Sequence, residues 1–134
     1  MLEQVSIYAE NKRGMLQHIT RILLDADINI LGSVTNDSAE YGIIRMVVSE
    51  PKKAYDALLQ NGFLCRRTPV LGVEVEDEVG NLNKLLCALE ESYINVNYIY
   101  LSFNRDSGKP IMVFHCEDCY EVADCLTRKG FTVL

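Results

Sequence analysis

The sequence predicts an α+β fold made of two ferredoxin-like units, each with the element order βαββαβ. Two observations lead to this prediction: an internal repeat that covers the whole chain, and the same alternation of strand and helix periods in both copies. Each unit should form a four-stranded antiparallel sheet with both helices on one face. We expect the two domains to be residues 1–67 and 68–134, packed side by side.

The repeat appears as short sequence matches in the same order. Gly14-Met15-Leu16 and Ile28-Asn29-Ile30 return 66 residues later as Gly80-Asn81-Leu82 and Ile94-Asn95-Val96. Near the end of each copy the offset is 68, so the second copy has gained two residues, which we place near residues 105–108. A dozen ordered matches at one near-constant offset indicate two homologous halves.

Periodicity then assigns the elements. Alternating apolar residues predict strands, apolar residues at helical spacing predict amphipathic helices, and Pro51 suits a first helical turn. In the first copy we expect a strand around 5–9, a helix over 14–27, strands over 28–35 and 41–49, a helix over 51–61 and a strand over 63–65. In the second copy we expect a strand over 70–76, a helix over 80–92, strands over 94–104 and 110–116, a helix over 118–129 and a strand over 131–134. Thr68-Pro69 would be a short linker.

Composition excludes several classes of protein. The chain has 134 residues and a formal charge of −6, and nucleic-acid binding requires clustered Lys and Arg instead. No apolar run approaches the roughly 20 residues of a membrane span, and the start lacks the features of a signal peptide. Five cysteines, an odd number, fit thiols kept reduced. We therefore expect a cytoplasmic protein.

The turn between the first strand and the first helix of each copy is the strongest candidate for function. Asn11 and Asp77 are good helix N-cap residues, and the glycines let the backbone approach a bound group closely. The unpaired amides of a first helical turn and the helix dipole favour an anion such as a carboxylate. The simpler interpretation is a capped helix with a tight turn.

A second polar position recurs after the same helix. Asn29 and Asn95 are each flanked by β-branched residues, and an asparagine is costly to bury at a strand start unless something pairs with it. It could bond the backbone across the turn. Alternatively, a ligand that touches both the turn and this asparagine would have to lie between two halves.

These residues resemble the ACT domain, a small regulatory module that binds amino acids. The resemblance rests on Glu10-Asn11-x-x-Gly14-x-Leu16-x-x-Ile19 with Ile28-Asn29-Ile30, and more loosely on the second copy. It implies paired units with an effector amino acid bound between them. The implied ligand-contacting region comprises Asn11, Arg13, Gly14, Met15, Leu16, Asn29, Ile30, Asp77, Val79, Gly80, Asn81, Leu82, Asn95 and Val96. Many members have Pro before the glycine, where Arg13 and Val79 stand here, and Asp77 adds a negative charge.

Other chemistry has little support in the sequence. Cys116-Glu117-Asp118-Cys119 is a single CxxC pair beside His115, with no second pair at a zinc-binding spacing, and Cys125 fits core packing. His18 fits a partly exposed helix residue, and no nucleophile has a base at a recognisable spacing. We therefore expect no enzyme activity, no metal and no cofactor.

The leading hypothesis is a non-enzymatic sensor that binds a free amino acid between ACT domains, within a homodimer, and acts on a metabolic enzyme partner. The alternative is a ligand-free structural or regulatory subunit that docks on an enzyme. Glu10, Asp77 and Glu78 favour a neutral or cationic ligand, whereas Lys12 and Arg13 weaken that preference.

Overall fold

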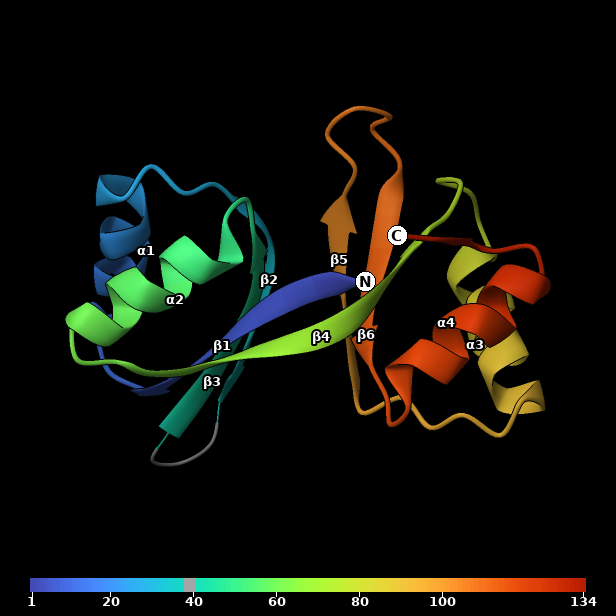
Figure 1. The fold of residues 1–134 in the computed structure, drawn as a ribbon, viewed down its shortest axis with the longest axis horizontal. Coiled ribbons are helices and arrows are strands. Elements are labelled where there is room, and N and C mark those ends of the chain that lie inside the picture. The colour runs from blue at the N-terminus through green and yellow to red at the C-terminus, as the bar shows by residue number, and fades with distance from the viewer. Residues whose placement is uncertain (38–40) are drawn as a thin grey trace. The chain divides into compact units, whose positions relative to one another are not determined.

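A computed structural model describes residues 1–37 and 41–134, the side chains of residues 37 and 41 excepted, and confirms the α+β fold (Figure 1). Contacts divide the chain into two compact units, residues 3–68 and residues 69–134 with Met1 and Leu2. The elements are β1 (Leu2–Glu10), α1 (Met15–Asp25), β2 (Ile30–Asp37), β3 (Tyr41–Val48), α2 (Pro51–Gln60), β4 (Leu64–Glu74), α3 (Asn81–Glu91), β5 (Tyr98–Phe103), β6 (Pro110–His115), α4 (Cys119–Arg128) and β7 (Thr132–Val133).

In the unit of residues 3–68 the strands follow the order β2-β3-β1-β4, and β3 pairs antiparallel with both of its neighbours. Both helices cover one face of this sheet (Figure 1). The alternation of apolar residues along β1 places Val5 and Ile7 in the core, where they meet Ile19, Leu23 and other apolar side chains of the helices. The sheet buries one apolar face and each helix buries one apolar stripe against it, and this determines the layered arrangement.

The unit of residues 69–134 repeats this plan. Its strands follow the order β5-β6-β4, all antiparallel, and the short β7 pairs with the other edge of β4. Helices α3 and α4 again cover one face (Figure 1). The core contains Leu71, Leu85 and Phe114, all fully buried, together with Val122 and Leu126.

The chain from Leu64 to Glu74 forms a single strand of 11 residues. The expected linker Thr68-Pro69 therefore lies inside β4, which corrects the sequence interpretation. Backbone groups on both sides of Pro69 continue the extended conformation, which proline permits because its fixed φ is compatible with a strand.

The four helices of the described residues all end in the same backbone motif. In α3 the N–H of Tyr93 donates to the carbonyl of Glu90 and that of Ile94 to the carbonyl of Leu89, both at 2.9 Å. The residue after the C-cap is left-handed, as this motif requires. That residue is Asp27 in α1, Gly62 in α2, Tyr93 in α3 and Gly130 in α4, with φ of 58°, 83°, 58° and 91°. Glycine adopts this conformation easily, whereas a tyrosine there carries backbone strain.

One strand start differs clearly from the sequence expectation, whereas the place of the insertion agrees with it. The strand expected over 94–104 begins only at Tyr98, because the helix-ending motif at residues 93–94 and the connection over 95–97 precede the first residue pair of the ladder, Tyr98 with His115. The two additional residues of the second copy fall in the longer connection over 104–109 between β5 and β6. There the side chain of Asn104 accepts hydrogen bonds from the N–H groups of Asp106 and Ser107, which shape the loop.

Candidate ligand-binding site

The turn into α1 is built around Gly14. The N–H of Lys12 donates to the carbonyl of Glu10 at 3.0 Å, and that of Met15 donates to the carbonyl of Lys12 at 3.2 Å. Gly14 is the N-cap, with φ 84° and ψ −5°. This left-handed conformation is why a glycine stands here, since a Cβ would be strained although there is space for it.

The turn into α3 has the same backbone. Glu78 donates to Glu76 at 2.9 Å, Asn81 donates to Glu78 at 3.3 Å, and the N-cap Gly80 has φ 92° and ψ −5°. Each of these two backbone hydrogen bonds in the turn into α1 therefore has its counterpart 66 residues later. The N-caps are Gly14 and Gly80, so the expectation that Asn11 and Asp77 cap these helices is wrong.

Neither helix start is closed by a side chain. Among the described residues, no side chain forms a capping hydrogen bond at the N-cap of α1 or of α3. No acidic residue lies in the first turn of either helix. An α-helix leaves its first amides without intrahelical acceptors and concentrates positive potential there, so both turns present donors suited to an anion.

The charges around the two turns differ. The turn into α1 contains Lys12, paired with Glu10 at 3.5 Å, and the exposed Arg13. The second contains Asp77 and Glu78, both exposed, and Glu76, which pairs with Lys109 at 2.7 Å. This contact with Glu76 raises the pKa of the Lys109 ammonium. The turn into α1 is thus more favourable for a carboxylate than the turn into α3.

One polar contact is particular to the second turn. The side-chain amide of Asn81 donates to the carbonyl of Glu76 at 2.6 Å, where the first copy has Met15. This bond fastens the start of α3 to the end of β4. Met15 instead packs half-buried against the core of the first unit.

Asn29 and Asn95 are exposed, so the expectation that they carry a burial cost is wrong. The backbone of Asn29 is nevertheless tied down. Its N–H donates to the hydroxyl oxygen of Ser49 at 2.9 Å, and its carbonyl accepts from the N–H of Ser49 at 2.9 Å. The side chains of both asparagines are accessible to a ligand.

The structure does not bring the turn and the asparagine of one unit together. They lie beyond opposite ends of α1 or α3, and each helix has 11 residues, about 16 Å at 1.5 Å per residue. The predicted residues are exposed except for the half-buried Met15, Ile30, Asn81 and Val96. Leu16 and Leu82 leave 47% and 42% of their surface accessible.

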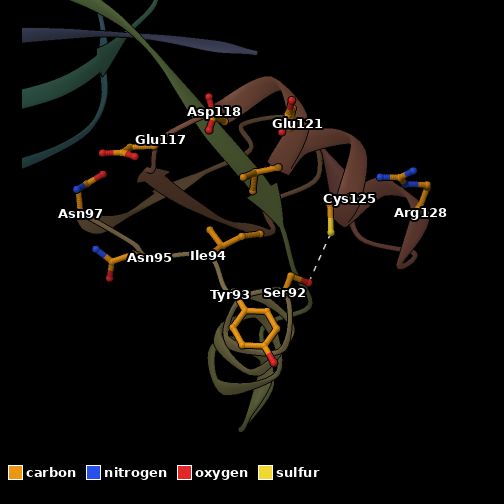
Figure 2. A pocket seen from close by; sticks show the side chains of 11 residues that line it. Ser92, Tyr93, Ile94, Asn95, Asn97, Glu117, Asp118, Glu121, Cys125 and Arg128 are labelled. Atoms are coloured by element: carbon orange, nitrogen blue, oxygen red, sulfur yellow. Dashed lines mark hydrogen bonds between the residues drawn. The ribbon is translucent and has the colours of Figure 1, made fainter.

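A cavity of about 490 Å³ lies beside Asn95, between the α3–β5 connection and α4 (Figure 2). Figure 2 shows Asn95 and Asn97 on one side of it and Cys125 and Arg128 on the other. The Sγ of Cys125 lies 3.6 Å from the hydroxyl of Ser92. The cavity is lined by Ser92, Tyr93, Ile94, Asn95, Asn97, Glu117, Asp118, Glu121, Val122, Cys125 and Arg128.

Sequence reasoning named Asn95 but missed the rest of this cavity wall as a candidate site. The available signal was the spacing of Glu121, Cys125 and Arg128, which puts them on one face of α4. The CxxC cysteines lie close to the same wall, and the described residues contain no group of three or more His, Cys, Asp or Glu side chains arranged to hold a metal. Within the described part of the chain, no helix is long and apolar enough to cross a membrane.

The fold and the duplication define a pair of small ferredoxin-like modules. A family model described as "ACT domain pair" matches residues 1–131, and the chain belongs to this family. No curated protein sequence matches the chain.

Two solved structures illustrate the likeness. Protein BT0572 from Bacteroides thetaiotaomicron is 31% identical, with a TM-score of 0.90 over 99% of this chain and 91% of that one. The ligand-free regulatory subunit of aspartate kinase from Thermus thermophilus is 14% identical, with a TM-score of 0.69 over 95% of this chain and 91% of that one. The second likeness concerns the fold alone.

Proposed function

We propose that this protein is a non-enzymatic regulatory protein that binds a free amino acid at its glycine turns. The observation that carries the proposal is that α1 and α3 both start at a left-handed glycine, with no capping side chain among the described residues. Membership of the ACT domain pair family supports a regulatory role. A regulatory subunit of aspartate kinase with the same fold is compatible with it.

A free amino acid suits this chemistry because it carries an anion and a cation close together. The first-turn amides of a helix can receive the carboxylate, and an asparagine side-chain oxygen or a backbone carbonyl can receive the ammonium. Both groups lose water on binding, so only a ligand matched at both ends gains free energy. Asn29 and Asn95 are accessible for the second role. Because each lies about 16 Å from the turn of its own unit, it can take this role only for a carboxylate bound at the turn of a different unit.

The two turns need not bind equally well. Lys12 and Arg13 add positive charge near the start of α1, whereas Asp77 and Glu78 add negative charge near the start of α3. We therefore infer that the turn into α1 binds the ligand more tightly than the turn into α3 does. Coulomb interactions of this kind between exposed groups are screened by salt, so the difference should shrink as the ionic strength rises.

The direct test is a thermal-shift screen of the twenty amino acids at millimolar concentration, followed by calorimetry on each responder. Asn29→Ala and Asn95→Ala should weaken binding. Asn61→Ala is a matched control, because the side chain of Asn61 only caps the end of α2 through a 2.7 Å bond to Ala57. Absence of any response to all twenty amino acids would contradict the proposal.

The position of the ligand between paired ACT units, the homodimer, the cytoplasmic location and an enzyme partner follow from the resemblance and from composition, and they stay predictions. Light scattering after size exclusion, with and without the responding amino acid, tests the homodimer. A protein that ignores every amino acid, yet co-purifies with one metabolic enzyme even when Asn29 is replaced by Ala, would support the ligand-free subunit instead.

A further inference from the structure

We propose that Cys116 and Cys119 form a redox-active dithiol, which a small-molecule disulfide converts to an intramolecular disulfide. The two sulfur atoms already lie 3.9 Å apart. A disulfide bond is about 2 Å long, so the sulfurs need to approach each other by only about 2 Å. The remaining cysteines of the chain are free thiols as well: Cys65, Cys87 and Cys125.

The local backbone brings the two thiols together. Cys116 directly follows β6, and Cys119 is the first residue of α4. Asp118 between them is left-handed, with φ 54°, and this bend folds Cys119 back over Cys116. The Cys119 thiol donates a hydrogen bond to the carbonyl of Cys116 at 3.1 Å, so the side chain already points toward its partner.

The pair borders a surface hollow that could admit a small disulfide. This hollow of about 490 Å³ is lined by Pro69, His115, Cys116, Glu117, Asp118, Cys119 and Tyr120. Cys119 retains 8% of its surface and Cys116 only 2%. This difference in exposure makes Cys119 the attacking thiol and Cys116 the resolving one.

The chemistry is two successive thiol–disulfide exchanges. The Cys119 thiolate attacks one sulfur of the disulfide RSSR, breaks the S–S bond and releases RS⁻, which takes up a proton. Cys116 then loses its proton and attacks the Cys119 sulfur of the mixed disulfide, releasing the second RS⁻. Two cysteine thiols are oxidised, RSSR is reduced to two RSH, and the Cys116–Cys119 bond is formed.

The Cys116 thiol resists ionisation, which matters for the order of the steps. Burial and the neighbouring Cys119 raise the pKa of Cys116 to about 12. Cys116 is therefore a poor first nucleophile in solution. Within the mixed disulfide its sulfur is held beside the target, and this proximity compensates for the small thiolate fraction.

The expected consequence concerns the cavity beside Asn95. Glu117 and Asp118 lie between the two cysteines and line that cavity, so forming the bond shifts part of its wall (Figure 2). His115 transmits the shift further, because its carbonyl accepts the N–H of Asn97 at 2.9 Å and its ring nitrogen Nδ1 lies 3.1 Å from the Asn97 side-chain oxygen. An effect on amino-acid binding rests on the proposed function, whereas disulfide formation does not.

The test is incubation of the reduced, folded protein with oxidised glutathione, followed by alkylation and peptide mass spectrometry. The expected result is a Cys116–Cys119 peptide lighter by two hydrogen atoms, with two molecules of glutathione released per protein. Cys119→Ser should abolish this product, while Cys116→Ser should stop at a stable glutathione adduct on Cys119. Cys87→Ser is the matched control and should leave the product unchanged, because Cys87 is exposed on α3 and remote in sequence.

A reaction that modifies the exposed Cys87 but leaves both Cys116 and Cys119 as thiols would overturn the proposal, because the oxidant is then shown to be active. A disulfide that forms only in urea would overturn it too. Titration of the oxidised and reduced proteins with a responding amino acid separates the two hypotheses. A disulfide without any amino-acid response contradicts only the proposed function.

Discussion

The two units have equivalent hollows whose lining residues differ in charge. Beside the end of α1, a hollow of about 460 Å³ is lined by Ala26, Lys52, Lys53, Asp56, Ala57 and Gln60. The corresponding cavity beside the end of α3 has Glu121 where the first unit has Lys53, and Arg128 where it has Gln60. The turns before α1 and α3 show a similar contrast, with Lys12 and Arg13 in the first and Asp77 and Glu78 in the second.

This contrast shows that the residues that determine the backbone differ from the charged residues that would determine which ligand binds. The backbone of each unit depends on apolar periodicity and on a few left-handed positions, and these agree between the copies down to single hydrogen bonds. Surface charges contribute little to stability, so they can diverge without changing the fold. The duplicate therefore presents one geometry with two electrostatic environments.

The largest expected effects come from matched substitutions in the two cores. Leu58 and Leu126 occupy equivalent places on α2 and α4, and both are fully buried. Leu58→Ala and Leu126→Ala should each lower the free energy of unfolding by about 2–5 kcal/mol, because each leaves a cavity. Urea denaturation measures the loss, and hydrogen exchange should locate it in residues 3–68 for the first variant and 69–134 for the second. Equal loss of protection across the whole chain in both variants would contradict separate cores.

The next effect concerns the glycine N-caps. Gly14→Ala and Gly80→Ala place a Cβ on a left-handed backbone with nothing within 4 Å, so strain alone should cost about 1–2 kcal/mol in each case. Gly14→Asn and Gly80→Asn are controls, because asparagine tolerates this conformation better. Chemical denaturation of the four variants provides the comparison. Alanine variants as stable as wild type would show that the left-handed turn is not required.

The stability of the protein should depend on pH mainly through Cys116 in the second unit. The folded-state pKa of Cys116 is about 12, above the ordinary value of 9.0, so above pH 9 the unfolded chain releases a proton that the folded chain retains. Stability should therefore fall as the pH rises above 9, by at most about 1.4 kcal/mol per pH unit from this group. Cys116→Ala should reduce the slope. Burial also raises the pKa of Cys65, which leaves a residual slope, and Cys65→Ala should reduce that part. Unchanged slopes in both variants would refute this explanation.

The smallest effect concerns the ends of α1 and α3. Tyr93 and Asp27 are both left-handed with φ 58°, and the Tyr93 side chain is 98% exposed. Tyr93→Gly should raise the unfolding free energy by about 0.5–1 kcal/mol, since relief of strain exceeds the entropy cost of glycine. Asp27→Gly should gain less, because aspartate is better tolerated there. Thermal unfolding of the two variants tests this order, and a destabilised Tyr93→Gly would point to a contact made by the tyrosine ring.

The fold was predictable because its signals are local and occur twice. Period-2 runs such as Val5-Ser6-Ile7 and helical spacing around Leu23 each determine one element, and the repeat confirms them in the second copy. The N-caps were mistaken because Asn11 and Asp77 have strong capping preferences, yet the chain uses the left-handed glycines that follow. The N-cap preference of asparagine and aspartate is outweighed here by the left-handed conformation of the N-cap, which glycine adopts without strain.

The candidate site was predictable only in part. The glycine turns were found because they repeat, whereas Glu121 and Arg128 lie on a helix face whose counterpart in the first copy has different residues. A cavity formed by α4 and the α3–β5 connection depends on how the chain packs in three dimensions, and no short motif encodes it. The 3.9 Å contact between Cys116 and Cys119 was not predictable from the sequence either, because it depends on the left-handed bend at Asp118.

Gly72 has a consequence for how the protein is made. A Cβ at this position would lie 2.4 Å from Cδ1 of Leu2 and 3.3 Å from Cγ2 of Ile111, and the carbonyl of Gly72 accepts the N–H of Leu134 at 2.8 Å. Leu2, which is half-buried beside Gly72, leaves the ribosome before Gly72 and Ile111. Residues 3–68 can therefore fold during translation. The apolar side chain of Leu2 stays exposed to solvent until the segments around Gly72 and Ile111 have been synthesised.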